Sequence, residues 1–356
     1  MRYIFIFLIL TILSCSKSTE LEPIAPNLPT TFISAADLSA LPQVEANNNV
    51  FYNLEGQQQD FLTILKNAGL NTVRLKLWKN PSINTASFTE VKSFTNRLKT
   101  LNLKVWITIH YSDTWADPGH QITPLQWQGL PFNALKDSVY NYTKKIISEI
   151  NPDFIQIGNE INNGFIYPYG KLDSNENQFI ILVNSAIKAI RDTNSNTKIM
   201  LHYAGYNGAQ TFFNKFKNSD YDIIGLSYYP KWHGKSLQAL ANTLNILSVT
   251  FDKEILIAET AYPFTFNWND LTNNIIGSND QILPEYPATP NGQHDFLNKI
   301  KSIVKATNKG VGFCYWGGEL IAFKGQQATN GSPWENQALF DFNNKALPVI
   351  EAFNAD

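Results

Sequence analysis

Hydrophobic and polar residues along this chain follow two alternating patterns. Short apolar runs bounded by turn-forming residues predict strands, and between them apolar residues recur every three or four positions, as in amphipathic helices. The predicted strands cover residues 31–37, 71–78, 103–110, 154–160, 198–203, 222–229, 254–260 and 310–316. The predicted helices cover residues 57–68, 88–101, 130–150, 177–191, 209–217, 237–247, 294–306 and 347–353.

Eight strands that alternate with helices indicate a parallel sheet with right-handed crossovers. Eight such units in one stretch are typical of a closed (β/α)8 barrel, the TIM barrel. A doubly wound open sheet is the alternative, but its glycine-rich turn is missing, because Gly310-Val311-Gly312 leads into a strand instead of out of one. We therefore expect an α/β fold with a single TIM barrel over residues 31–356.

The N-terminus has the layout of a secretory signal. Met1-Arg2 precedes an apolar run that is too short to span a bilayer, and Ile12-Leu13-Ser14-Cys15 resembles a bacterial lipobox. We expect a lipoprotein signal peptide over residues 1–14, a lipidated Cys15 and a flexible tether over residues 15–30. An ordinary signal peptide with a chance cysteine is the alternative. The expected location is the cell envelope, at the outer membrane, with membrane contact through the lipid anchor only.

Composition narrows the classes of partner. The chain has 356 residues, and its formal net charge of -2 provides no basic excess to neutralise phosphates, so we expect no nucleic-acid partner. With Cys15 lipidated, Cys314 is the only other cysteine, and no intrachain disulfide can form. Long loops follow five predicted strands, at residues 79–87, 111–129, 161–172, 262–293 and 317–336. In a TIM barrel such loops build the active face.

Two glutamates follow buried strands. Glu160 ends the fourth predicted strand and Glu259 lies near the end of the seventh. If residues 154–160 are one strand, side-chain alternation places Glu160 on the same face as Gln156 and opposite Asn159. Hydrolysis of a glycosidic bond needs one carboxylic acid and one carboxylate on either side of the bond. Either glutamate alone could be the first solvated residue of a loop, but the two together favour catalysis.

Polar neighbours of the two glutamates strengthen this interpretation. Arg74 lies inside the second strand and needs an acidic partner if buried; Glu259 is a candidate, and the pair would keep that carboxylate ionised. A salt bridge that serves folding alone is the alternative. Tyr228 or Tyr229 could donate a hydrogen bond to Glu259. Asn159 could hold a substrate hydroxyl or, as is commoner for Asn, satisfy loop backbone.

Aromatic residues and histidines complete the candidate chemistry. Five tryptophans at strand ends or in long loops could stack on sugar rings: Trp115, Trp127, Trp232, Trp316 and Trp334. Trp106, inside the third strand, is expected in the core. The five histidines show no pair at zinc-site spacing, so no metal is expected, and His110 and His202 are interpreted as hydrogen-bonding groups.

These residues resemble a known family, the endo-β-1,4-galactanases of glycoside hydrolase family 53. The resemblance runs from about residue 32 to the C-terminus, in the family's order. It rests on residues 35–39, 73–81, 110–118, 157–161, 227–230, 259–263 and 310–316. The stretch His110-Tyr111-Ser112-Asp113-Thr114-Trp115-Ala116-Asp117-Pro118 is the most specific of these.

The resemblance implies roles for individual residues. Glu160 would be the acid/base and Glu259 the nucleophile of a retaining endo-hydrolase. The residues expected around the reacting sugar are Arg74, His110, Asp113, Trp115, Asn159, Tyr228, Tyr229 and Trp316. The implied substrate is β-1,4-galactan, as in type I arabinogalactan and pectin side chains, together with its galacto-oligosaccharides. We expect a monomer without a cofactor.

The chain departs from the family's pattern at two places. Relatives usually carry an acid directly after the tryptophan of the eighth strand, whereas here Gly317-Gly318 precede Glu319. Some bacterial relatives have closely spaced calcium-binding acids after the seventh strand, whereas residues 266–270 offer only Asp270. We therefore expect no calcium there.

Two other functions remain open from the sequence. A glycan-capture lipoprotein could keep the barrel without catalysis, although both carboxylates are present. A barrel endoglycanase could act instead on mannan or cellulose; galactose is axial at its fourth carbon where glucose is equatorial, so a panel of polysaccharides separates these functions.

Overall fold

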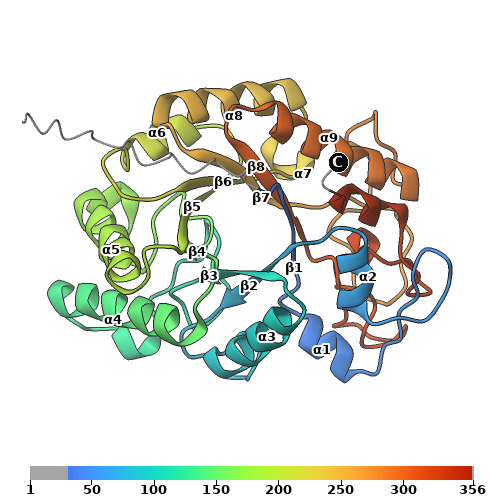
Figure 1. Cartoon of the computed structure of the whole chain (residues 1–356), viewed down its shortest axis with the longest axis horizontal. Helices are drawn as coiled ribbons and strands as arrows, with labels where there is room; N and C mark the ends of the chain where they lie inside the picture. Colours follow the sequence, from blue (N-terminus) through green and yellow to red (C-terminus); the bar gives the residue numbers. More distant parts are fainter. Residues whose placement is uncertain (1–30, 355–356) are drawn as a thin grey trace, which may run out of the picture. The chain divides into compact units, whose positions relative to one another are not determined.

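The computed structural model describes residues 31–354, so the expected signal peptide, Cys15 and the tether lie outside the described residues. Eight parallel strands pair in chain order, and β1 pairs with β8, which closes the barrel. The TIM-barrel prediction is confirmed, and Figure 1 shows the barrel along its axis with helices around it. The strands are β1 (Ile33–Asp37), β2 (Thr72–Leu77), β3 (Lys104–Ile109), β4 (Phe154–Ile157), β5 (Lys198–Ala204), β6 (Ile223–Ser227), β7 (Glu254–Thr260) and β8 (Gly310–Trp316).

The outer helices match most of the predicted ones. They are α2 (Phe61–Asn67), α3 (Phe88–Thr100), α4 (Phe132–Ile150), α5 (Leu172–Thr193), α6 (Ala209–Asn214), α8 (Leu237–Phe251) and α9 (Pro290–Ala306). The structure adds α1 (Leu41–Ala46), α7 (Pro230–His233) and three 3-10 turns in loops, η1 (Leu125–Trp127), η2 (Asn279–Gln281) and η3 (Glu335–Gln337). The closing helix is a 3-10 helix, η4 (Pro348–Phe353).

Helix α9 begins earlier than predicted for a local reason. The Thr289 side chain accepts a hydrogen bond from the Gly292 backbone N–H, and Pro290 occupies the first turn. A threonine cap followed by proline is a strong start signal for a helix. Residues 290–293 are therefore helical although their apolar periodicity is weak.

Two apolar layers and one polar layer organise the barrel. Residues on the outer face of the strands, such as Val73 and Leu75, belong to the large core shared with the helices. A smaller cluster drawn from seven of the strands, including Trp106 and Met200, is separate from that core and fills the barrel interior. The Arg74 guanidinium lies 5.3 Å from the centre of the Trp106 ring. A polar layer therefore rests on the apolar filling at the level of the strand ends.

The end of β4 differs from the predicted alternation. The strand ends at Ile157, because Gly158 and Glu160 have positive φ values of 72° and 46°. A Cβ atom at Gly158 would lie 2.4 Å from the Ile161 side chain, so only glycine fits this turn. The turn brings Asn159 to within 3.1 Å of the Gln156 amide. The prediction that Asn159 lies opposite Gln156 is wrong, since a two-residue period holds only within a strand.

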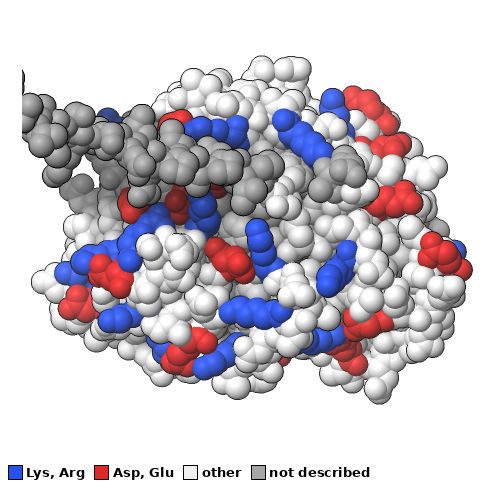
Figure 2. Space-filling view, viewed as in Figure 1, with Lys and Arg blue, Asp and Glu red and all other residues white. Residues whose placement is uncertain are grey.

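The surface carries both signs of charge. On the face in Figure 2, lysine and arginine side chains are interspersed with aspartate and glutamate and form no patch of one sign. Exposed ion pairs such as Lys92–Glu149 at 2.9 Å show the same mixing. Among residues 31–354, no helix combines the length and apolar character that a bilayer crossing requires.

Candidate active site

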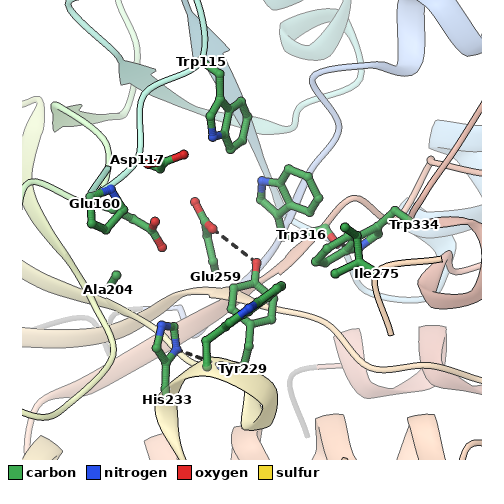
Figure 3. Close-up of a pocket in the computed structure, with 12 residues that line it drawn as sticks. Trp115, Asp117, Glu160, Ala204, Tyr229, His233, Glu259, Ile275, Trp316 and Trp334 are labelled. Carbon is green, nitrogen blue, oxygen red and sulfur yellow. Dashed lines mark hydrogen bonds between the residues drawn. The ribbon is translucent and has the colours of Figure 1, made fainter. Parts of the chain in front are cut away.

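A cavity of about 540 Å³ lies where the strand ends and their long loops meet. Glu160 and Glu259 both line it and extend toward each other (Figure 3). One carboxylate oxygen of Glu160 lies within 4.8 Å of one of Glu259. Retaining glycosidases hold their carboxyl groups about 5–5.5 Å apart, whereas inverting enzymes need about 6.5–9.5 Å. The separation therefore fits the retaining geometry.

Arg74 holds Glu259 and a second acid. Its Nη2 lies 2.7 Å from Glu259 Oε1, and its Nη1 lies 2.8 Å from Asp37 Oδ2, with all three side chains almost fully buried. The Glu259 contact is an ion pair without an aligned hydrogen bond to Oε1. Burial alone lowers the pKa of Arg74, but the charges of Glu259 and Asp37 raise it above its usual value. Arg74 therefore stays charged beside Glu259.

Only one of the two candidate tyrosines contacts Glu259. The Tyr229 hydroxyl donates to Glu259 Oε2 at 3.2 Å, as Figure 3 shows. The Tyr228 hydroxyl instead donates to the Gly234 carbonyl at 3.0 Å, and its ring stacks on Phe296. Neighbouring residues at the end of β6 point to opposite sides, so only Tyr229 reaches the cavity.

The two glutamates have different electrostatic surroundings. Burial and the nearby charge of Glu259 raise the pKa of Glu160 to about 8. Burial also raises the pKa of Glu259, but the positive charge of Arg74 opposes this shift. In a coupled pair that shares one proton, the negative charge is therefore most stable on Glu259 and the proton on Glu160. This division of charge is the one that the expected roles, Glu160 as acid and Glu259 as nucleophile, require.

His110 supports the aromatic wall of the cavity through its contact with Trp115. His110 Nδ1 accepts hydrogen bonds from Trp78 Nε1 at 3.3 Å and from the Ala116 backbone at 3.1 Å. The His110 ring packs edge-on against Trp115 at 5.3 Å. Burial lowers the pKa of His110 well below its usual value, and the positive charge of Arg74 lowers it further. The ring therefore stays neutral. This histidine fixes the orientation of a tryptophan that lines the cavity.

Both polar atoms of the Asn159 side chain form hydrogen bonds within the protein. Its Oδ1 accepts from Arg74 Nη2 at 2.8 Å, and its Nδ2 donates to the Ala116 carbonyl at 2.9 Å. The second of these bonds is the loop-backbone contact that the sequence left open as an alternative to a substrate hydroxyl. Asn159 therefore ties the turn after β4 to the loop after β3.

The cavity walls are largely aromatic. Trp115, Trp232, Trp316 and Trp334 line it, together with Tyr229, Asp117, Pro118, Ala204, His233 and Ile275. Trp127 is buried outside the cavity against Tyr142. Asp113 is also not a lining residue, because its carboxylate accepts the Leu125 backbone N–H at 2.8 Å. Both residues order the long loop between β3 and α4.

The glycine pair after β8 makes room for Trp334. Gly317 has a φ of 71°, and a Cβ atom there would lie 2.7 Å from the Trp334 ring. Trp334 packs edge-on against Trp316 with ring centres 4.7 Å apart and donates to the Trp316 carbonyl at 3.2 Å. Glu319 turns away from the cavity, and its Oε1 accepts the Ala40 backbone N–H at 2.7 Å. The Trp334 indole thus occupies the space that a side chain at position 317 would need.

One cluster has the geometry of a metal site. Single ligand atoms of Glu160, His202 and Glu259 lie within 4.8 Å of one another. Both nitrogens of His202 already have hydrogen-bond partners, Gln156 at 2.9 Å and Ser227 at 2.9 Å. Arg74 also supplies the positive charge that Glu259 requires. These contacts favour a carboxylate pair with histidine support over a metal centre.

Three residues that contact Arg74 or Glu160 were not singled out from the sequence, although two of them lie in the matching stretches 35–39 and 227–230. Asp37, Gln156 and Ser227 contact Arg74 or Glu160 from three different strands. Their positions at strand ends give a general signal, since the ends of parallel barrel strands converge. Ile275, in the long loop after β7, lines the cavity without any motif that could have indicated it.

The fold and the paired carboxylates at the ends of β4 and β7 define a class of protein, the TIM-barrel glycoside hydrolases. The family model described as "Glycosyl hydrolase family 53" matches residues 33–353. The chain belongs to glycosyl hydrolase family 53.

Named relatives agree with this assignment. The chain is 33% identical to "Endo-beta-1,4-galactanase" of Bacillus subtilis (strain 168), over 90% of this chain and 85% of that protein. It is 32% identical to "Arabinogalactan endo-beta-1,4-galactanase" of Cellvibrio japonicus (strain Ueda107), over 94% and 93%. The solved structure "Ignisphaera aggregans GH53 catalytic domain" aligns with a TM-score of 0.86 at 37% identity, covering 93% of this chain and 97% of that one.

Proposed function

We propose that this protein is a retaining endo-β-1,4-galactanase that cleaves galactan and its oligosaccharides. The observation that carries the proposal is the separation of Glu160 and Glu259 oxygens, within 4.8 Å across an aromatic-lined cavity. Relatives named as galactanases over most of the chain support the substrate. The aromatic walls suit the apolar faces of sugar rings.

The first step forms a covalent intermediate. A Glu259 oxygen attacks the anomeric carbon as the bond to the leaving sugar breaks, and Glu160 transfers its proton to the departing oxygen. Arg74 and Tyr229 hold Glu259 by its two oxygens, which fixes the carboxylate at the reacting carbon.

The second step releases the intermediate. Glu160, now a carboxylate, removes a proton from a water molecule, whose oxygen attacks the anomeric carbon while the bond to Glu259 breaks. The proton returns to Glu160, and two inversions give net retention. Ionisation of Glu160 after the first step lets it act as the base, and its raised pKa restores the acid.

The test is a panel of linear polysaccharides incubated with the purified protein. We expect reducing ends to be released from β-1,4-galactan, with a falling size distribution typical of internal cleavage, and β-configured products at early times by NMR. Mannan and cellulose are the comparison substrates. Release from mannan or cellulose alone would assign a different endoglycanase activity, and binding of galactan without cleavage would indicate a glycan-capture protein.

We also propose that a lipid on Cys15 anchors the enzyme at the cell envelope. This proposal rests on residues 1–30 of the sequence, and membrane contact requires no other part of the chain. In cells producing the full chain, we expect the protein in the membrane fraction, and a Cys15→Ala variant outside it. Equal partitioning of the two proteins would contradict the anchor.

A further inference from the structure

An ion pair and a line of hydrogen bonds connect Glu259 to Glu160 through protein side chains. Arg74, which is paired with Glu259, donates from Nε and Nη2 to Gln156 Oε1 at 3.3 Å each. Gln156 Nε2 lies 2.9 Å from His202 Nδ1, and His202 Nε2 lies 2.9 Å from Ser227 Oγ. The line ends at Glu160, whose Oε1 is 2.5 Å from Ser227 Oγ.

The direction of this line is fixed by Arg74. A guanidinium has donors only, so Gln156 must turn its oxygen to Arg74 and its NH2 group to His202. The Glu160 backbone N–H also points at His202 Nδ1, at 3.3 Å. A backbone N–H has one fixed direction, so Nδ1 accepts from Glu160 and is the unprotonated nitrogen, and the ring proton is on Nε2. The Gln156 NH2 group, which also lies 2.9 Å from the Gly158 carbonyl and 3.1 Å from Asn159 Oδ1, has a second hydrogen to direct at Nδ1. The His202 Nε2–H then donates to Ser227, whose own proton is directed to Glu160 Oε1.

Geometry and burial both favour this neutral tautomer of His202. A proton on Nδ1 would face the Glu160 backbone N–H, and the ring is fully buried. Burial lowers the pKa of His202 well below its usual value, and the positive charge of Arg74 lowers it further. Asn159 Oδ1 lies 3.3 Å from Nδ1 but accepts from Arg74 Nη2 at 2.8 Å and from Gln156 Nε2 at 3.1 Å. These two donors use both lone pairs of the oxygen, so it does not accept a proton from the ring.

We propose that His202 and Ser227 are positioning residues that decide which oxygen of Glu160 carries the catalytic proton. Oε1 is held as the acceptor of the Ser227 hydroxyl, so the acidic proton is on Oε2. No described residue donates a hydrogen bond to Oε2, and Glu160 lines the cavity. The proton is thus presented to the departing sugar oxygen. This inference rests on the proposed function.

The other charged groups around Glu160 set its basal acidity. They are Glu259 on β7, Arg74 on β2 and Asp117 in the loop after β3. None of them contacts the Ser227 hydroxyl. A change at Ser227 therefore alters the hydrogen bond to Oε1 while leaving these charges in place.

The test compares two substrates in a Ser227→Ala variant. Galactan has a poor leaving group that needs the proton, whereas a dinitrophenyl galacto-oligosaccharide does not. General acid catalysis contributes about 10²–10⁴-fold, and misplacing the proton should remove part of it. We expect kcat/KM to fall about tenfold for galactan and less than about twofold for the dinitrophenyl substrate. Because the Ser227 bond lowers the pKa of Glu160, the alkaline limb of the galactan profile should move to higher pH.

Two further variants separate positioning from folding. Ser248→Ala removes a serine hydroxyl that is equally buried but bonded to the Asn308 carbonyl on the outer side of the barrel; we expect no change in either substrate or in the pH profile. His202→Leu removes the donor that orients Ser227 and should reproduce the Ser227→Ala pattern, which provides the test if the latter does not fold.

The outcomes also distinguish this inference from the proposed function. If the unsubstituted protein cleaves neither substrate, the galactanase proposal fails. If it cleaves both, but Ser227→Ala and His202→Leu slow the two substrates equally and leave the alkaline limb in place, the positioning role is wrong and the hydroxyl serves only folding.

Discussion

Replacing Arg74 with glutamine tests what keeps Glu259 ionised. The substitution removes the positive charge 2.7 Å from Glu259 Oε1 and 2.8 Å from Asp37 Oδ2, and leaves two buried carboxylates uncompensated. Glutamine is shorter than arginine, so its amide can replace the Nε contact to Gln156 but not the Nη2 contact to Asn159. The change therefore removes the charge together with the Asn159 contact.

The expected shift follows from the geometry. Unit charges about 4 Å apart attract by about 4 kcal/mol at an effective dielectric constant near 20, and each pKa unit corresponds to about 1.4 kcal/mol. Loss of Arg74 should therefore raise the pKa of Glu259, because the charge that most opposes the effect of burial is then gone. Because the nucleophile must be ionised, the acidic limb of kcat/KM should move to higher pH, by about 2–3 pH units on these figures. Removing one member of a buried ion network should also cost about 3–5 kcal/mol of folding stability.

The assay is the pH dependence of kcat/KM on galactan, measured where thermal melting shows the variant to be folded. Arg97→Gln is the control, because Arg97 pairs with Glu45 at 2.6 Å at a partly exposed position; its acidic limb should not move. A folded Arg74→Gln protein whose acidic limb stays within about half a pH unit of the unsubstituted protein would show that Arg74 does not control the charge of Glu259.

Three further predictions concern the carboxylates. Glu160→Ala should reduce kcat/KM on galactan by about 10²–10⁴-fold but spare the dinitrophenyl substrate, whereas Glu259→Ala should abolish activity on both substrates. If Glu160→Ala slowed both substrates equally, its role as the acid would be wrong. Burial and the charge of Asp37 raise the pKa of Glu319 to about 8, so its contribution to stability is complete below its unfolded value and lost as pH rises through 8. Glu319→Gln should flatten the fall of unfolding free energy between about pH 5 and 8, by up to about 1.4 kcal/mol per pH unit; an unchanged slope would contradict the assignment. Glu335 and Asp270 join the loops after β7 and β8 by accepting backbone N–H groups, so a chelator should leave the melting temperature unchanged, while Glu335→Gln should cost about 1–3 kcal/mol. If the chelator lowered the melting temperature of the unsubstituted protein, a bound cation would be indicated instead.

Periodicity was sufficient to predict the barrel, because each strand–helix unit carries its own signal. The strands at residues 254–260 and 310–316 have the predicted bounds. The lengths of α1 and α7, at six and four residues, explain why they were missed: helices this short show less than two turns of apolar periodicity. Local pattern is thus enough for long elements and insufficient for single turns.

The site was predictable only in part, because some of its residues are defined by contacts across strands. Glu160 comes shortly after β4 and Glu259 is the second-last residue of β7, and a charge at the end of an apolar run is conspicuous in the sequence. Asp113 and Tyr228 lie in two other motifs, residues 110–118 and 227–230, yet their side chains bind the Leu125 amide and the Gly234 carbonyl. A motif fixes the position of a residue along the chain but not the direction of its side chain once the loop folds.

The contacts of Arg74 explain why the polar layer needs the closed barrel. Arg74 on β2 reaches Asp37 on β1, Gln156 on β4 and Glu259 on β7. The neighbouring strand β1 supplies only Asp37, whereas Gln156 and Glu259 come from strands that do not pair with β2, and an incomplete network would be costly. Folding of the barrel therefore assembles the ion network and the carboxylate pair in the same event. Because the groups are fixed before substrate binds, little reorganisation is needed when charge develops at the sugar, and such preorganisation is a major source of electrostatic catalysis.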